Sequence, residues 1–307
     1  WQIPIITDSN HQKAKILNID KNRIDQFLKD YDVIVVAGFQ GVNMDGNITS
    51  LGRGGSDTTA VAIAAQVGAL RCDIYTDVDG IFTTDPKVVS NAKKLDSITM
   101  EEMLELAGQG AKVMQTRAVE FANKYNVPVR VLSSFNEGNG TLITLKDESM
   151  ENASVSGIAF QKDQIKFTLH GVGDIPGTAY RILGPISDAE VEVDVIVQNV
   201  SVDGKTDFTF TVSSEDEDIV KKVLEDVKND INLKEIIVDS NIAKVSLVGV
   251  GMRSQAGVAS KAFKALSEND VNIQIICTSE IKITMVVEKD LVDKAVEVLH
   301  KEFELEK

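Results

Sequence analysis

The second half of the chain contains two copies of one pattern. Residues 179–199 can be set over residues 259–279 so that apolar positions fall on apolar positions. Each copy reads as a strand, a helix, two strands and an amphipathic helix, and the order βαββαβ is typical of ferredoxin-like domains. We therefore predict two small α/β domains in tandem, at residues 155–235 and 236–307.

The first half has the pattern of a larger α/β domain. Residues 33–39, VIVVAGF, form an apolar run rich in β-branched side chains, which is typical of a strand covered on both faces. Similar runs at 72–77 and 127–132 are separated by helical stretches of crossover length. The pattern predicts a parallel sheet between helices in residues 1–145. The polar stretch 146–154 is then a surface linker to the repeats.

One helix start can be predicted from local chemistry. Thr99 is a suitable N-cap, Glu102 stands where a capping-box partner belongs, and Ile98 and Met103 are spaced as a hydrophobic staple. A second helix is expected at residues 111–125, returning the chain to the strand that follows.

Composition excludes several classes of function. The net charge is −15 and no block of lysine or arginine could follow a nucleic acid or an anionic membrane, so neither is expected as a partner. Cys72 and Cys277 lie in apolar runs, which fits free thiols in a cytoplasmic protein. His11, His170 and His300 have no spaced partners, so we expect no metal site of the cysteine–histidine kind and assign these histidines no role.

The segment LGRGGSDTTAVAIAAQVGA, residues 51–69, is the strongest candidate for a binding loop. Its glycines let backbone amides approach a ligand beside Arg53, and Ser56 can cap a helix that opens at Asp57 and favours anions. The segment is not a Walker A loop, because no lysine follows the glycines. The alternative is a tight turn with surface charges.

A second candidate, YTDVDGIFTTDPK, spans residues 75–87. Polar groups just past a buried strand are where open α/β sheets bind ligands, here a nucleotide. A calcium loop is excluded, because the EF-hand register would put Tyr75 at the first ligand position and Pro86 at the twelfth. A plain Asp-Gly turn remains the alternative.

The third candidate is a pair of turns in the repeats, at residues 171–179 and 249–259. Each feeds a helix N-terminus whose amides could bind a carboxylate, and Gln198 and Asn199 could meet the other groups of an amino acid. Ser279 fills the matching place in the second copy. Alternatively, the turns only scaffold an oligomer.

Short segments along the whole chain carry a resemblance to one family. They are ITDSNHQKAKI, VAGFQG, TSLGRGGSDTTA, YTDVDGIFTTDPK, EEMLELAGQGAKVM, DIPGTA, VQNVS, VGMRSQAGVA and TSEI. In this order, with the repeats, they closely resemble the aspartate kinases; related amino-acid kinases generally lack two tandem repeats of this kind, called ACT domains. The resemblance implies the C-terminal portion of an amino-acid kinase αβα sandwich followed by two ferredoxin-like ACT domains. It also implies phosphorylation of the L-aspartate side-chain carboxylate, with ATP and Mg²⁺, as the first step toward lysine, threonine and methionine.

The resemblance assigns roles to particular residues. In the glycine segment, Arg53, Gly54, Gly55 and Ser56 would hold aspartate, and Asp57 would orient a catalytic lysine. Arg53, Asp57 and Lys112 are the expected catalytic residues. The expected nucleotide-binding residues are Ser56, Thr76, Asp77, Val78, Asp79, Gly80, Ile81, Phe82, Lys87 and Lys112.

The repeats are expected to bind lysine, threonine or both, and to join the chain into a homodimer or higher oligomer. The first effector pocket would use Asp174, Ile175, Pro176, Gly177, Thr178, Ala179, Glu192, Val193, Asp194, Gln198 and Asn199. The second would use Asn272, Ile273, Ser279 and Glu280. Gln274 stands where some lysine-sensitive relatives carry an acidic residue, which leaves the identity of the effector open.

One departure from the family bears on activity. The opening strand of the family, with its lysine-phenylalanine-glycine-glycine loop, has no counterpart in this sequence, so we expect little kinase activity from this polypeptide alone. Two alternatives stay open: a non-catalytic regulatory subunit or fragment, and a carboxylate or carbamate kinase with another substrate. An internal start at Met150, giving a separate regulatory subunit, is a further hypothesis.

Overall fold

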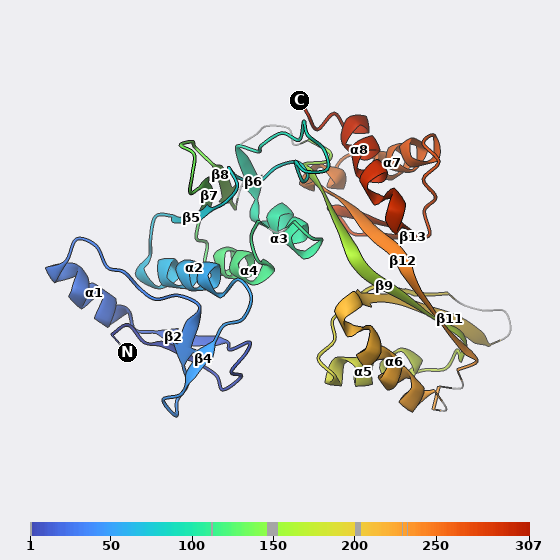
Figure 1. The fold of residues 1–307 in the computed structure, drawn as a ribbon, viewed down its shortest axis with the longest axis horizontal. Coiled ribbons are helices and arrows are strands. Elements are labelled where there is room, and N and C mark those ends of the chain that lie inside the picture. The colour runs from blue at the N-terminus through green and yellow to red at the C-terminus, as the bar shows by residue number, and fades with distance from the viewer. Residues whose placement is uncertain (1, 112, 146–152, 200–203, 229, 232) are drawn as a thin grey trace.

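The computed structural model describes residues 2–111, 113–145, 153–199, 204–228, 230–231 and 233–307. These residues form two four-stranded sheets in the N-terminal part and one six-stranded sheet in the C-terminal part. Figure 1 shows the two parts side by side, with helix α3 (Met100–Gly108) between them. No helix in the described ranges combines the length and apolar character needed to cross a bilayer.

The first sheet is small and mostly antiparallel. Its strands lie in the order β2-β1-β3-β4. They are β1 (Ile5–Thr7), β2 (Ile16–Ile19), β3 (Gln40–Val42) and β4 (Ile48–Ser50). Helix α1 (Lys21–Asp30) follows β2 and begins where the Asp20 carboxylate accepts hydrogen bonds from the backbone of Asn22 and Arg23.

The strand predicted at residues 33–39 is absent, so that prediction was wrong. The segment has no regular structure, and Val33 and Val35 are 76% and 93% exposed. Within the described chain, no neighbouring strand offers this segment a hydrogen-bond ladder, and an unpaired strand is not stable by itself. Instead, the segment lines an open groove of about 780 Å³ together with residues such as Phe27 and Tyr31.

Three helices pack on the second sheet, and the first of them contains most of the glycine segment. Its order is β5-β7-β8-β6, with β5 parallel to β7 and β7 antiparallel to β8. The strands are β5 (Cys72–Thr76), β6 (Ser97–Thr99), β7 (Val129–Ser133) and β8 (Thr141–Thr144), and the helices are α2 (Gly55–Val67), α3 and α4 (Thr116–Lys124). The predicted strands at 72–77 and 127–132 are confirmed to within two residues. An apolar cluster between sheet and helices includes Met103, Val129 and Ala118, none more than 1% exposed.

The predicted capping box of α3 is confirmed. The Thr99 hydroxyl accepts from the backbone of Glu102, whose carboxylate accepts from the backbone of Thr99. The following helix is shorter than predicted: it runs over Thr116–Lys124, and Gly110, with a positive φ of 108°, lies just after α3. A short connector therefore separates α3 from α4.

The six-stranded sheet contains both repeats. Its order is β10-β11-β9-β12-β14-β13. The strands are β9 (Gly157–Gly173), β10 (Val193–Gln198), β11 (Lys205–Ser213), β12 (Glu235–Val248), β13 (Ile275–Thr278) and β14 (Lys282–Glu288). Helices α5 (Thr178–Asp188) and α6 (Glu217–Val227) cover one half, here called the first repeat, and α7 (Val258–Ser267) and α8 (Val292–Glu302) cover the other, the second repeat.

Strands β9 and β12 are long enough to belong to both repeats. Ile158, near the start of β9, packs in the core of α7 and α8, whereas Phe167 packs in the core of α5 and α6. In the same way, the end of β12 contributes Val245 to the second repeat, while Ile236 near its start packs on the first. Each repeat therefore contains parts of both β9 and β12. Figure 1 shows both strands running diagonally from one repeat to the other.

Helix α3 docks on the second repeat through a buried carboxylate. Glu102 is 3% exposed, and besides capping α3 it accepts hydrogen bonds from the Ser156 hydroxyl at 2.6 Å and the Val250 N–H at 2.9 Å. Further along the same helix, Glu105 pairs with Lys282 at 2.8 Å. One side of α3 is thus fastened to the turn that opens the second repeat.

A second contact joins the loop after β5 to helix α8. Buried His300 lies with Nε2 3.0 Å from the hydroxyl of Thr83, which lies within the predicted segment 75–87. Burial lowers the pKa of His300 and outweighs the opposing effect of the Glu306 carboxylate, 3.8 Å from Nδ1. The neutral imidazole is therefore the form that the fold favours.

This burial predicts an acid-sensitive stability. Below the ordinary histidine pKa of about 6.5, the unfolded chain binds a proton at residue 300 that the native chain does not, so stability should fall as the pH drops through this value, by at most about 1.4 kcal/mol per pH unit. A His300→Gln variant should lose this contribution and show a shallower pH dependence between pH 7 and 5. Urea unfolding across this range measures it, with His11→Gln at an exposed site as control. Equal slopes for His300→Gln and the native chain would contradict the prediction.

Candidate functional site

The glycine segment forms a tightly turned loop at the N-terminus of α2. Gly52 and Gly54 have φ values of 78° and 67°, in the left-handed region, and Arg53 lies between them with an exposed side chain. Leu51 anchors the start of the loop by donating its N–H to the carbonyl of Phe39 at 2.9 Å. Within the described chain the Arg53 guanidinium has no hydrogen bond or ion pair, so it is free to bind a ligand.

The helix begins earlier than predicted. Gly54 is the N-cap and α2 starts at Gly55, so Ser56 lies inside the first turn and its predicted capping role was wrong. The left-handed conformation of Gly54 turns the chain into the helix and takes the place of a side-chain cap. The backbone N–H groups of Ser56 and Asp57 find no backbone acceptor within the described chain. The positive end of α2 therefore offers amides next to Arg53.

Asp57 occupies the first turn of the same helix. Its carboxyl group is half-buried, and this burial raises its pKa above the ordinary value. No described cation pairs with it. A cationic group placed beside Asp57 would favour its ionised form and be oriented by it.

The start of helix α4 forms a wall against this loop. A Cβ atom at residue 54 would lie 1.9 Å from Cγ of Gln115, so glycine alone fits under the Gln115 side chain. Two residues on, Arg117 donates to the carbonyl of Leu51 at 2.9 Å and to that of Ala14 at 2.7 Å. Sequence reasoning missed both residues, since they lie about sixty positions away and no local motif marks them.

The predicted nucleotide segment follows the carboxyl end of β5. The turn 68–71 joins α2 to β5, so the N-terminus of α2 and the carboxyl end of β5 lie at the same end of this layer. Asp77 and Asp79 are exposed, and Asp79 accepts a hydrogen bond from the Asn136 side chain at 2.9 Å, which lowers its pKa. The side chain of Ile81, by contrast, packs in the core, so only its backbone could face a nucleotide.

The remaining members of this segment are distributed as follows. Thr76 ends β5 and donates to Asp77; Val78 and Phe82 are half-buried; Gly80 is buried; Lys87 is exposed on the loop that packs against the second repeat. Lys112, Met150 and most of the linker 146–154 lie outside the described residues.

The two predicted effector turns have matching geometry. Gly177 and Gly257 both serve as N-caps, of α5 and α7, with the same φ of 92° and ψ of −3°. In the first turn, the Thr178 hydroxyl donates to the carbonyl of Gly173 at 2.8 Å, while Ile175 is exposed. The first turn of each helix thus presents backbone amides at the place where an effector carboxylate was expected.

Other predicted effector residues are already engaged. Asp194 forms an ion pair with Lys244 of β12, which is only 3% exposed. Burial alone would raise the pKa of Asp194, but the Lys244 ammonium outweighs it and the pKa is lowered. In the second repeat, Arg253 pairs with both Glu280 and Glu101 of α3. Ala179 lies in the first turn of α5, and the remaining predicted residues lie in the turns and at the strand ends beside them: Asp174, Pro176, Glu192, Val193, Gln198, Asn199, Asn272, Ile273 and Ser279.

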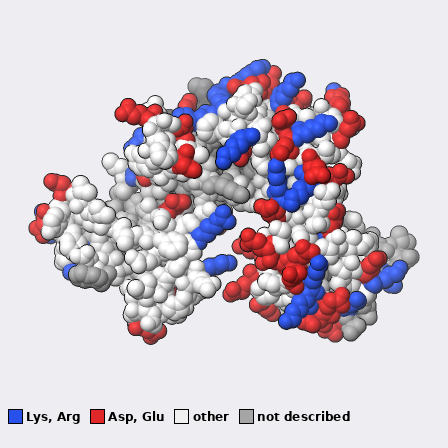
Figure 2. Space-filling model, viewed as in Figure 1, with Lys and Arg blue, Asp and Glu red and all other residues white. Residues whose placement is uncertain are grey.

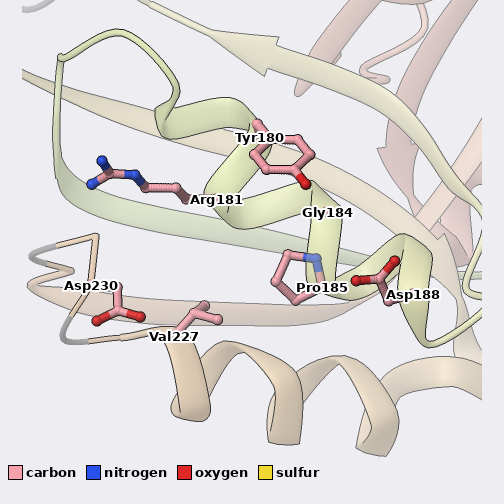
Figure 3. Close-up of a pocket in the computed structure, with 7 residues that line it drawn as sticks. All are labelled: Tyr180, Arg181, Gly184, Pro185, Asp188, Val227 and Asp230. Atoms are coloured by element: carbon pink, nitrogen blue, oxygen red, sulfur yellow. The ribbon is translucent and has the colours of Figure 1, made fainter.

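A separate hollow lies on the helix side of the first repeat. It lies between α5 and α6 (Figure 3). Its volume is about 420 Å³. It is lined by Tyr180, Arg181, Gly184, Pro185, Asp188, Val227 and Asp230. None of the predicted effector residues lines it, and acidic side chains gather over this part of the surface in Figure 2.

Comparison with known proteins assigns the family. Residues 2–133 match the model of the amino acid kinase family, and residues 245–303 match an ACT domain model. The chain is 59% identical over 306 residues to an aspartate kinase of Pseudomonas fluorescens, which covers 99% of this chain and 74% of that protein. It is also 46% identical to an aspartokinase of Mycobacterium bovis, over 99% of this chain and 73% of that one. The chain belongs to the aspartate kinase family.

Solved aspartate kinases share its fold. The structure of E. coli aspartokinase III in complex with aspartate and ADP aligns with a TM-score of 0.80 at 28% identity, over 97% of this chain and 67% of that one. Clostridium acetobutylicum aspartate kinase also gives 0.80, at 28% identity, over 92% and 66%. The predicted fold class, an amino-acid kinase domain followed by ACT domains, is confirmed. This aspartate kinase uses ATP to phosphorylate the side-chain carboxylate of L-aspartate, the first step of lysine, threonine and methionine synthesis.

Proposed function

We propose that the loop of residues 51–57 is where this kinase grips aspartate. One observation carries the proposal: at the start of α2, the Arg53 guanidinium and the backbone N–H groups of Ser56 and Asp57 lie close in the chain, and none of them has a partner among the described residues. A guanidinium can hold a carboxylate through two parallel hydrogen bonds, and the helix amides favour negative charge. Gly54 and Gly55 allow the ligand to approach the backbone closely.

The nucleotide would bind beside this loop, past the carboxyl end of β5. Residues 76–82 and Lys87 would line its pocket, and Lys112 would face its phosphates. Mg²⁺ commonly uses one or two protein carboxylates together with phosphate oxygens, and exposed Asp77 fits this need. When bound, the ion would neutralise charge on the phosphoryl group being transferred.

The chain's own contribution to the reaction is positioning. Phosphoryl transfer to a carboxylate requires donor and acceptor to be aligned and their charges balanced, and no covalent enzyme intermediate is needed. Arg53 would orient the acceptor, and Asp57 would orient a catalytic lysine, because no cation of the described chain pairs with its half-buried carboxylate.

The repeats would sense end-product amino acids. E. coli aspartokinase III has been solved with lysine and aspartate, at a TM-score of 0.75 and 29% identity to this chain. Here lysine, threonine or both would bind at the turns that precede α5 and α7. An effector ammonium reaching Asp194 would have to displace Lys244, which belongs to the other half of the sheet. The effector would thereby favour one of two arrangements of the repeats.

The repeats and the two free cysteines bear on assembly and location. We propose a homodimer or higher oligomer that forms through the repeats, in the cytoplasm, where Cys72 and Cys277 stay unpaired. We also propose a kinase domain of residues 1–145, a linker of 146–154, and repeats of 155–235 and 236–307 that exchange the ends of β9 and β12.

Turnover measured with a panel of possible phosphoryl acceptors tests the proposal directly. With MgATP, the full-length enzyme should form ADP with L-aspartate but turn over L-glutamate, one methylene longer, about 10- to 200-fold less efficiently. Acetate and carbamate should give no turnover, which separates this function from other carboxylate or carbamate kinases. Calorimetric titration with aspartate supplies a readout independent of turnover. Equal turnover with glutamate, or none with aspartate, would contradict the proposal.

A further inference from the structure

Arg117 holds the glycine loop without belonging to it. Its guanidinium reaches two backbone carbonyls, those of Leu51 and Ala14, from the first turn of α4. The two acceptor residues are 2% and 0% exposed. No carboxylate in the described ranges lies within ion-pair distance of Arg117, so this arginine serves backbone geometry rather than charge pairing.

The carbonyls that Arg117 binds fix the entrance to the loop. Ala14 donates its N–H to Ser50, whose own N–H goes to His11, so residues 11–14 run along the strand end that leads into the loop. Leu51 is tied on its other side to Phe39. Arg117 closes this arrangement from the opposite direction, and Gly52 follows immediately.

A glycine-rich loop needs such external support. Glycines give the backbone freedom, and three of the four residues between Leu51 and Ser56 are glycines, the fourth being exposed Arg53. The Gln115 side chain packs against Gly54 and restricts the loop there, while Arg117 fixes the carbonyl of Leu51 at the start of the loop. These two contacts therefore hold the backbone on either side of Arg53.

We propose that Arg117 is a positioning residue for aspartate binding, acting through the loop that carries Arg53. This inference rests on the proposed function of that loop. Two different nitrogens of the planar guanidinium, Nη1 and Nη2, donate to the two carbonyls, whereas a lysine would have a single nitrogen to place between them and should reproduce the arrangement only in part. Small displacements of a substrate-orienting group cost large factors in rate.

Kinetics of the full-length enzyme with two variants test this. Arg117→Met should raise KM for aspartate roughly 10- to 100-fold and leave KM for ATP within about twofold, and Arg117→Lys should give an intermediate rise. Arg23→Met, an exposed arginine on α1, is the matched control and should change neither value. Hydrogen exchange of residues 51–57 should speed up in Arg117→Met, without a matching change in α8.

The possible results distinguish a failure of the Arg117 proposal from a failure of the proposed aspartate site. If Arg53→Ala leaves aspartate KM unchanged, the loop is not the aspartate site and the proposed function fails. If Arg53→Ala raises it but folded Arg117 variants keep the native KM for aspartate, the positioning role is overturned. Should Arg117→Met fail to fold, Arg117→Lys decides alone, and a native aspartate KM in that variant overturns the proposal.

Discussion

Replacing Arg53 with alanine should raise KM for aspartate about 100-fold while the protein remains folded. The loss corresponds to about 3 kcal/mol, the value expected for charge-assisted hydrogen bonds to a carboxylate. The side chain is exposed and unpaired within the described chain, so the free energy of unfolding should change by less than about 0.5 kcal/mol. Steady-state kinetics with both substrates and urea unfolding measure the two quantities.

A lysine at position 53 gives the sharper comparison. Arg53→Lys keeps the charge but cannot form two parallel bonds with one carboxylate, so we expect it to recover only part of the lost affinity. Arg71→Ala, an exposed arginine near the start of β5, removes the same charge elsewhere and should leave KM for aspartate unchanged. Native kinetics in Arg53→Ala would remove aspartate from this loop.

Replacing Glu102 with alanine should lower the free energy of unfolding by about 3 kcal/mol or more. The carboxylate serves the Thr99 cap, the Ser156 hydroxyl and the Val250 N–H within a site that is 3% exposed. Each buried donor left without a partner costs about 1–3 kcal/mol, and losing the cap adds about 1 kcal/mol. Urea unfolding measures the change, and hydrogen exchange of α3 and of residues 249–253 shows where it acts.

The neighbouring glutamate supplies the control for this change. Glu101 has a half-exposed side chain whose ion pair with Arg253 lies at the surface, so Glu101→Ala should cost no more than about 1 kcal/mol. Equal losses at Glu101 and Glu102 would show that the buried carboxylate does not hold α3 to the second repeat. A variant Glu102→Gln, which keeps the shape and one acceptor oxygen, should fall between alanine and the native residue.

Local chemistry in the sequence predicted those parts of the fold that local contacts determine. The capping box at Thr99 and Glu102 depends on residues three positions apart, and it appears in the structure as expected. The repeat pattern likewise predicted the order of elements in both halves of the six-stranded sheet. The resemblance of the glycine segment to its family agrees with an Arg53 that has no partner among the described residues, and the roles of the residues in this segment stay predictions.

The failures arose where distant parts of the chain decide the outcome. The run at 33–39 has strand-like composition, but a strand requires a neighbour, and composition cannot supply one. Ser56 has the preferred chemistry of a cap, yet the left-handed Gly54 made a side-chain cap unnecessary. The contacts of Arg117 with Ala14 and of His300 with Thr83 join residues 103 and 217 positions apart, and no pattern within a short window reveals them.

The sharing of β9 and β12 determines how the regulatory half can respond to a ligand. Both strands pack in two hydrophobic cores. A change in the twist of either strand at one core must therefore be accommodated at the other core. An amino acid bound near α5 would therefore be felt near α7, and through the contacts of α3 by the catalytic half, without any wholesale separation of domains.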